Sequence, residues 1–359
     1  MAIEYLDFTD DTLPLVSELV VSRFGNGAIA SLRKILANPL RRQVIPAGCI
    51  AFRDGRAVCF KASMVRRLYF GQEELLGLVG GYFCKAVKGC PLSAVLEVQA
   101  RAEWNRYPCR LRFGNTCIYT TMRLNAQLGA HQGTNSWSEM RFGIVRPIRL
   151  AGLFLRRKLL RLPQPEAALP VVPPDETTVY AASGGLSVRR WRSVDERIGN
   201  FWRRYLSNNR GVVLSRDRET LDWLFGSDIA TGRCVLLALR RDDEGIDGFI
   251  VLRPMEDSPC RWRIMDMIVL GNAPEPLYLL LKGAKRFLRR ETSAITLEST
   301  GFPDFVQPIL RRYLPFRRHT GHNRFEWISD DPTVIEVLTE TGNTVASWFY
   351  GPFDGDYCL

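Results

Sequence analysis

The residues best placed for chemistry in this 359-residue chain follow the apolar run 75–86. That run ends at Val87, Lys88, Gly89 and Cys90, and 91–104 is helical in pattern. A proline stands at the first position of that helix, where its missing N–H costs nothing. The unpaired amides of a helix start bind anions, and the lysine adds positive charge. The segment is therefore either an anion-binding loop or a plain strand-to-helix turn.

Cysteine and histidine do not indicate a metal site or a disulfide. The nine cysteines include no C-x-x-C pair, and several stand within apolar, strand-like runs, which predicts reduced core thiols. His319 and His322 are close in sequence, but no cysteine or acid stands beside them at a ligand-like spacing. We therefore expect no bound metal.

Length and composition indicate a globular protein with two domains. A chain of 359 residues exceeds the roughly 100–200 residues of one domain. Hydrophobic residues make up 46% of the chain, and no run approaches the length of about 20 apolar residues that spans a bilayer. The N-terminus carries Glu4 and Asp7 where a signal peptide needs a basic and then an apolar run. The expected location is therefore the cytoplasm.

The net charge of +11 comes mostly from arginine and favours an acidic partner. Coenzyme A phosphates, an acidic acyl carrier protein, anionic lipid and nucleic acid all meet this requirement. The basic residues are spread along the chain and form no basic stripe interleaved with aromatics. Nucleic acid is therefore not expected as a partner.

One break divides the chain. Prolines recur through 163–174 and remove backbone donors, which predicts a linker. Just before it, 148–162 combines leucines at helical spacing with five basic residues, the pattern of an amphipathic basic helix. This helix either packs across the domain junction or contacts a membrane or a carrier protein. The predicted organisation is a domain at 1–147, the helix and linker at 148–185, and a domain at 186–359.

The order of predicted elements is the same before and after the linker. Each half begins with a strand and two helices, continues through a hairpin and a further strand to a long helix, and ends in a strand, a helix and closing strands. The first half closes with 135–144, and the second closes with strands near 322–328 and 345–350. This repetition predicts two α/β domains with mixed sheets.

This organisation resembles the GNAT acetyltransferase superfamily, specifically its two-domain proteins. These include Fem-type peptidyl transferases, N-acyl amino acid synthases and acyltransferase-like proteins of bacterial polysaccharide clusters. The likeness is strongest in the strand, loop and helix of 75–104. It continues in Phe113, Gly114 and Asn115 and in a helix that ends with Leu128, Gly129 and Ala130. The resemblance implies two tandem GNAT-like domains whose sheets splay after the fourth strand.

In that family the loop after the fourth strand holds the pyrophosphate of the acyl-carrying coenzyme through the pattern Gln/Arg-x-x-Gly-x-Gly/Ala. The matching place is 86–91, where only Gly89 fits, because Ala86 and Pro91 depart from the pattern. In the second half the same place holds two prolines and Glu275, whose carboxylate repels phosphate. The resemblance therefore implies that acetyl-CoA or another acyl-CoA binds in the first half, across Val87, Lys88, Gly89, Cys90, Leu92 and Ser93.

Acyl transfer also needs an acid for the leaving thiolate. Family members often place a tyrosine four residues before the glycine that closes the helix after the fifth strand. That position is Asn125, which cannot protonate a thiolate. Tyr119, earlier on the same helix, and Tyr82, late in the fourth strand, are the candidate substitutes. Otherwise both are packing aromatics.

Three carboxylates are candidates for binding the acceptor. The aromatic C-terminal segment looks like the terminal segment of the polysaccharide-cluster relatives, and its Asp354 and Asp356 would face a cationic or sugar acceptor. Asp266, on the strand 261–269, is the third candidate. The alternative is a docked tail whose aspartates shape a turn.

The expected function is transfer of an acyl group from acyl-CoA, or from an acyl carrier protein, to an amine or hydroxyl of a small molecule or a cell-envelope sugar. The alternative is a non-catalytic tandem protein that kept the fold and lost the donor site, which Ala86, Pro91 and Asn125 favour. A Fem-type transferase that uses aminoacyl-tRNA is a third alternative, favoured by charge alone.

Overall fold

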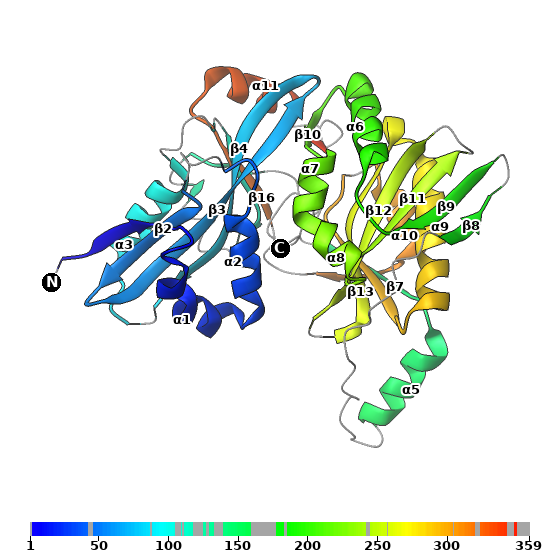
Figure 1. Cartoon of the computed structure of the whole chain (residues 1–359), viewed down its shortest axis with the longest axis horizontal. Coiled ribbons are helices and arrows are strands. Elements are labelled where there is room, and N and C mark those ends of the chain that lie inside the picture. Colours follow the sequence, from blue (N-terminus) through cyan, green and yellow to red (C-terminus); the bar gives the residue numbers. More distant parts are fainter. Residues whose placement is uncertain are drawn as a thin grey trace.

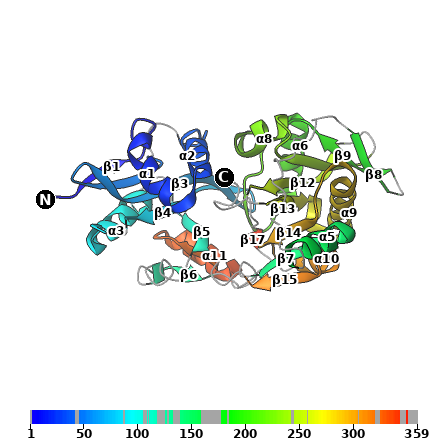
Figure 2. The same cartoon turned by 90° about the horizontal axis from the view of Figure 1, so that it is seen from below.

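Two mixed sheets with helices packed on their faces lie side by side in the computed structural model (Figures 1 and 2). This is the α/β class that the sequence predicts. Among the described residues, no helix is both long and apolar enough to cross a bilayer. The structure describes residues 2–41, 46–86, 88–104, 109, 111–117, 125–126, 129–132, 139–158, 177–182, 185–241, 245–256, 258–303, 305–319, 324–342 and 348–349.

The first sheet has the order β1-β2-β3-β4-β5-β16-β6, and β10 and β17 extend it beside β3. Alternate residues of β2 face opposite layers, as a strand requires. Ile50 and Phe52 pack with the helices α1 and α2, whereas Cys49 and Ala51 pack with α3. The elements are β1 (Glu4–Asp7), α1 (Leu13–Phe24), α2 (Gly27–Leu36), β2 (Gly48–Arg53), β3 (Arg56–Phe70), β4 (Glu73–Lys85), α3 (Leu92–Gln99), β5 (Leu111–Cys117), β6 (His131–Gln132), β10 (Val212–Leu214), β16 (Arg324–Ile328) and β17 (Trp348–Phe349).

The second sheet has the order β15-β7-β14-β13-β12-β11-β9-β8. Helix α9 covers one face of β11 and β12, and α6 covers the other together with the short helices α7 and α8. The elements are β7 (Glu139–Ile144), β8 (Thr177–Ala181), β9 (Leu186–Trp191), α6 (Glu196–Asn208), α7 (Arg218–Leu221), α8 (Ser227–Ala230), β11 (Val235–Arg241), β12 (Ile246–Met255), β13 (Ser258–Val269), α9 (Pro274–Glu291), β14 (Thr296–Thr300), α10 (Gln307–Tyr313) and β15 (Phe316–His319). The remaining described α-helices are α5 (Pro147–Lys158) and α11 (Pro332–Gly342).

Each sheet takes an inner strand from the other half of the chain. Strand β7 lies between β14 and β15 in the second sheet, and β16 lies between β5 and β6 in the first. The expectation that 135–144 closes the first sheet and 322–328 the second is therefore wrong. The division at 1–147, 148–185 and 186–359 stays a prediction about segments of sequence, because both sheets combine strands from both sides of it.

Both sheets splay after the strand that the resemblance makes the fourth. Strand β4 pairs in parallel with β5 only from Gly77 to Val79, although β4 continues to Lys85. Strand β13 pairs with β14 from Arg261 to Arg263 and continues toward Val269 paired with β12 on its other side. These short parallel pairings confirm the splayed sheets expected from the resemblance. Each splay leaves a gap between two strands beside one of the two loops considered as donor sites.

A polar cluster around Asp217 joins the two halves. Its carboxylate accepts a hydrogen bond of 2.9 Å from Arg67 Nη1 on β3 and one of 2.6 Å from the hydroxyl of Ser215. It also caps α7 by accepting a 2.7 Å bond from the amide of Thr220. Burial raises the pKa of Asp217, but these hydrogen bonds outweigh burial and hold the pKa below its usual value. The charged form of Asp217 therefore stabilises the junction.

We expect Asp217→Asn to lower the free energy of unfolding by about 1–2 kcal/mol at pH 7. Because the folded-state pKa is depressed, this contribution is present above the ordinary pKa of about 4 and is lost as pH falls through the folded value. The difference between Asp217→Asn and wild type should therefore shrink toward pH 3, as measured by urea unfolding. A difference that stays constant or grows in acid would contradict this assignment.

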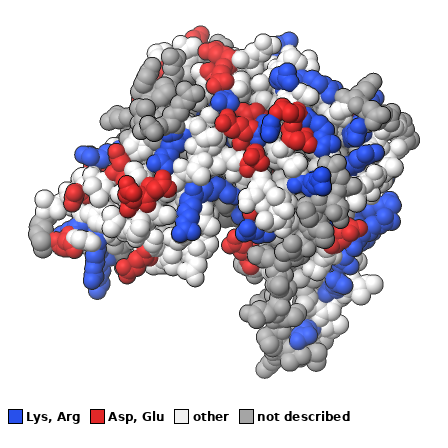
Figure 3. Space-filling view, viewed as in Figure 1, with Lys and Arg blue, Asp and Glu red and all other residues white. Residues whose placement is uncertain are grey.

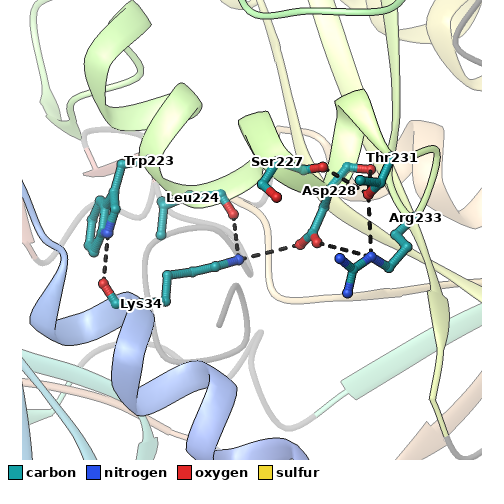
Figure 4. Close-up of polar contacts among 7 residues, drawn as sticks. All are labelled: Lys34, Trp223, Leu224, Ser227, Asp228, Thr231 and Arg233. Carbon is teal, nitrogen blue, oxygen red and sulfur yellow. Dashed lines mark hydrogen bonds and ion pairs between the residues drawn. The ribbon is translucent and has the colours of Figure 1, made fainter.

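Helix α2 is attached directly to the second half (Figure 4). Lys34 Nζ donates a 2.8 Å hydrogen bond to the carbonyl of Leu224 and lies 3.3 Å from a carboxylate oxygen of Asp228. In return, the indole of Trp223 donates a 2.8 Å bond to the carbonyl of Lys34. The core residues of α2 and of α6 to α8 also belong to one hydrophobic cluster. The two halves therefore share a core, which fixes the space between them.

Helix α5 does not pack across the junction. Ile148 is 87% exposed, Phe154 62% and Leu155 50%, and the helix projects from the body of the protein (Figure 1). The expectation of a helix clamped between domains is therefore wrong for 147–158, and 159–162 lie outside the described residues. On the face seen in Figure 3, basic side chains occur over both halves and are interspersed with acids.

Candidate functional site

Strand β4 carries a β-bulge where it leaves β5. Phe60 of β3 lies opposite Cys84, and Ala62 lies opposite Gly81, so that two residues of β4 face one of β3. One of the two is Tyr82, which has a φ of 49°. A left-handed conformation costs a residue with a Cβ roughly 1–2 kcal/mol, and bulges re-aim side chains beside functional sites. This outlier therefore marks the end of β4 as a candidate site.

The bulge places Tyr82 on the face of the first sheet that α1 and α2 cover. Its ring packs edge-on against Phe24 of α1, with ring centroids 5.2 Å apart. The neighbouring Phe83 instead belongs to the cluster under α3, on the opposite face of the sheet. Tyr82 is thus held by an aromatic neighbour on the α1 and α2 side.

The loop after β4 leads into an open helix start. Gly89 has a φ of +84°, and a Cβ there would point into open space. The amides of Ala94 and Val95 donate hydrogen bonds to the carbonyl of Pro91. The first two amides of α3 therefore belong to Leu92 and Ser93, and both residues are exposed. Among the described residues 88–99, no side chain caps the helix and no carboxylate stands in its first turn. This is the geometry of an anion site.

Basic side chains surround that helix start. Lys85 and Lys88 are exposed, and Arg53 Nη1 donates a 3.4 Å hydrogen bond to the carbonyl of Gly89. Their charge adds to the positive end of the helix dipole. Of the donor residues predicted from the sequence, Lys88, Gly89, Cys90, Leu92 and Ser93 lie together here, and Val87 lies outside the described residues.

The corresponding loop of the second half disfavours anion binding. It forms a 3-10 turn, Leu270–Asn272, in which the side-chain oxygen of Asn272 accepts a 3.3 Å bond from Tyr205. Helix α9 follows with prolines at 274 and 276, which have no N–H, and with Glu275 in its first turn. Missing donors and a carboxylate both disfavour phosphate.

Cysteine supplies no nucleophile near the loop. Burial raises the pKa of Cys84 to about 12 and also raises the pKa values of Cys59 and Cys90. These thiols therefore stay protonated near neutral pH. The seven cysteines whose side chains the structure describes are free, and no group of three or more His, Cys, Asp or Glu side chains in the described part of the chain is arranged to hold a metal ion.

A cavity of about 360 Å³ lies between the two halves, and Tyr82 is part of its wall. Pockets between domains are frequent ligand sites. Apart from Tyr82, sequence reasoning missed this site, because its residues come from distant segments and form no motif. The first half contributes Phe24, Gly27, Ala28, Ser31 and Tyr82, and the second contributes Arg253, Pro254, Met255, Glu256, Arg263 and Met265.

Solved structures share this arrangement of splayed sheets. A GCN5-related N-acetyltransferase from Anabaena variabilis aligns over 91% of this chain and 72% of its own, with 12% identity and a TM-score of 0.54. A tandem GNAT protein of the clavulanic acid pathway aligns over 92% and 99%, with 13% identity and a TM-score of 0.51. The fold is the GNAT fold.

The likeness extends to a larger GNAT-fold enzyme. N-myristoyltransferase of Saccharomyces cerevisiae, solved with bound myristoyl-CoA, aligns over 91% of this chain and 78% of its own, with 11% identity and a TM-score of 0.52. No family model and no curated protein matches the sequence. At these identities the likeness concerns the fold alone.

Asn125, which the resemblance placed at the position of the catalytic tyrosine, is part of a buried hydrogen-bond chain. Its side-chain oxygen accepts a 2.5 Å bond from Gln99 of α3, and its nitrogen donates a 2.8 Å bond to Glu326 of β16. Asn125 thereby links α3 to the strand that comes from the second half. Tyr119, the other candidate on the helix predicted from the sequence, lies outside the described residues.

Asp266 is not placed to meet an acceptor. Its side chain is 0% exposed and forms a bidentate ion pair with Arg216, whose Nε lies 3.0 Å from one carboxylate oxygen and whose Nη2 lies 3.2 Å from the other. The expectation that Asp266 faces a cationic or sugar acceptor is corrected by this burial. Asp354 and Asp356 lie outside the described residues.

Proposed function

We propose that the protein transfers an acyl group from acyl-CoA to an amine or hydroxyl acceptor. The observation that carries the proposal is the contrast between the two loops of the GNAT fold. The first has an open helix start, Gly89 and basic neighbours, whereas the second has two prolines and Glu275. Pyrophosphate binds at the start of α3, and the thioester lies in the splay between β4 and β5.

The chemistry at the end of β4 needs few groups. The acceptor attacks the thioester carbonyl, and backbone N–H groups of β4 beyond Val79, which face the splay and not β5, stabilise the oxyanion. The C–S bond then breaks, and the hydroxyl of Tyr82 protonates the leaving thiolate. The cavity beside Tyr82 holds the acceptor. An amine acceptor would agree with the N-acetyltransferases that share the fold.

We also propose a further partner, an acidic carrier protein or an anionic membrane. The basic surface of helix α5 favours it. Helix α5 exposes apolar side chains together with Arg149, Arg156 and Lys158. It begins beside the end of α9, because Arg146 Nη2 donates a 2.5 Å bond to the carbonyl of Arg289. Basic residues with exposed apolar side chains suit either partner. The cytoplasmic location and a cell-envelope acceptor stay predictions.

Isothermal titration calorimetry with acetyl-CoA and with a longer acyl-CoA tests the donor site. We expect Gly89→Val to weaken donor binding by about tenfold or more, since a β-branched side chain is strained at positive φ and blocks approach of phosphate to the backbone. Gly271→Val is the matched control, because Gly271 also has a positive φ, 62°, and open space at its Cβ in the second loop.

The two variants separate the hypotheses. Weaker binding in Gly89→Val but not in Gly271→Val supports a donor site in the first half. The reverse pattern moves the site to the second loop and contradicts the proposal. Absence of binding by either acyl-CoA to the wild-type protein favours the non-catalytic alternative.

A further inference from the structure

Helix α5 carries an exposed apolar stripe. Ile148, Ala151 and Leu155 lie at helical spacing on one side of the helix, and all are exposed. Phe154 lies three positions after Ala151 and adjoins them. Ile148, Phe154 and Leu155 are three of the eight large hydrophobic side chains that are exposed in the described part of the chain. Because such a stripe ordinarily faces the core of a globular protein, its exposure here favours an apolar partner.

Basic side chains flank this stripe. Arg149 and Arg156 lie seven positions apart, on the side of the helix next to the stripe, and Lys158 is the last residue of the helix. All three are exposed. The sequence has no Asp or Glu from 140 to 165, and Figure 3 shows basic and uncharged side chains on the projection that α5 forms. Helix α5 is therefore an amphipathic helix with a positively charged side.

The end of α9 continues the basic surface beside α5. Arg146, just before α5, donates a 2.5 Å hydrogen bond from Nη2 to the carbonyl of Arg289. Burial lowers the pKa of Arg146, and the like charges of Arg149 and Arg289 lower it further. Arg290 is also exposed, and Glu291 is the acid of that turn. The positive charge gathered at this corner of the molecule favours an anionic partner.

We infer that the partner of α5 is the surface of an anionic lipid bilayer. The apolar stripe enters the boundary between headgroups and acyl chains, and the basic side chains of α5 and of the end of α9 contact the headgroups. The helix projects from the body of the protein, so it reaches a flat surface before either sheet does (Figure 1). This inference chooses between the two partners proposed for α5 and does not depend on acyl transfer.

Co-sedimentation with vesicles tests the inference without any acyl donor. The full chain should bind vesicles made of equal parts of phosphatidylcholine and phosphatidylglycerol. It should bind vesicles of phosphatidylcholine alone at least about tenfold more weakly, because the basic side chains then lack anionic headgroups. Failure to bind the anionic vesicles would overturn the inference, and so would equal binding to both kinds.

Charge variants locate the contact. Arg149→Gln/Arg156→Gln should weaken binding to the anionic vesicles by about 30-fold, since each basic residue at such a surface contributes roughly fivefold. Arg192→Gln/Arg203→Gln is the matched control, because it removes the same charge from exposed positions after β9 and on α6. Its binding should stay within about twofold of wild type, and the thermal midpoint should barely change in either pair. Equal losses in both pairs would show that net charge, and not α5, drives binding.

A tryptophan at 154 reports whether the apolar stripe enters the bilayer. Phe154→Trp should lose more fluorescence than the wild-type protein when the anionic vesicles carry brominated acyl chains. Phe154→Ser should weaken vesicle binding by about tenfold, because it removes apolar area from the contact. Vesicle binding without this extra quenching would contradict insertion. Binding of an acidic acyl carrier protein to α5, with no binding of vesicles, would overturn the choice of lipid.

Calorimetry with acyl-CoA keeps this inference separable from the proposed function. The variants of α5 should bind acyl-CoA as the wild-type protein does, since the proposed donor site lies in the other half. If vesicles bind α5 and acyl-CoA does not bind, the transferase proposal fails and the membrane surface stands. If acyl-CoA binds and anionic vesicles do not, the membrane surface fails and the transferase proposal stands.

Discussion

Replacement of Tyr82 by phenylalanine should lower kcat for acyl transfer by about 100-fold, because general acid catalysis contributes roughly 10²–10⁴-fold. The substitution removes only the hydroxyl. The ring keeps its edge-on contact with Phe24, so the bulge and the cavity wall should be retained. Donor affinity, measured by calorimetry, should stay within twofold of wild type, since the proposed pyrophosphate site lies at the start of α3.

Tyr69→Phe is the matched control for this effect. Tyr69 lies on the adjacent strand β3, and its hydroxyl donates a 3.0 Å hydrogen bond to Glu74 away from the cavity. Its loss should leave kcat unchanged. If Tyr82→Phe retains full kcat with a saturating acceptor, Tyr82 is a packing aromatic and the leaving thiolate is protonated by another group.

Arg216→Met should lower the free energy of unfolding by about 3–5 kcal/mol, because it leaves the carboxylate of Asp266 buried without its counter-ion. Both side chains are 0% exposed. The guanidinium also donates a 2.8 Å bond to the carbonyl of Leu214 in β10, the strand that the second half contributes beside β3. The loss therefore affects the junction as well as the core of the second half. Urea unfolding measures it.

The double variant Arg216→Met/Asp266→Leu separates the charge from the packing. Removing both ions should recover most of the lost stability, since apolar pairs of similar volume replace buried ion pairs at little cost. Arg218→Met, which removes an exposed ion pair with Glu196, should cost less than about 1 kcal/mol. A double variant as unstable as Arg216→Met would show that the arginine acts through its shape or its bond to Leu214.

Local signals in the sequence located most elements. The Asp54 and Gly55 pair predicts the β2–β3 hairpin, and both residues have the positive φ that this turn requires. Pro91 predicts the start of α3 because proline is tolerated only in the first turn. Prolines 274 and 276 with Glu275 distinguish the second loop from the first. Each signal depends on residues a few positions apart, so it can be recognised without knowledge of the tertiary structure.

The candidate site was predictable only in part. Lys88, Gly89 and Ser93 lie together because they are near neighbours in sequence, within one loop and the helix start that follows it. Asp266 was mispredicted, because a polar residue on an apolar strand looks the same in sequence whether it faces a ligand or a buried arginine. Its partner Arg216 is fifty residues away in sequence, and no local sequence pattern predicts that ion pair.

The sequence by itself determined the kind and order of elements and the contrast between the two loops considered as donor sites, since spacing and turn chemistry act over a few residues. The tertiary structure alone decided which sheet each strand joins. Strands β7 and β16 have similar patterns and exchange places between the sheets, a choice made by the core that the halves share. The same packing places Tyr82 of the first half and Met265 of the second in the wall of one cavity, because only the closed junction brings together segments so distant in sequence.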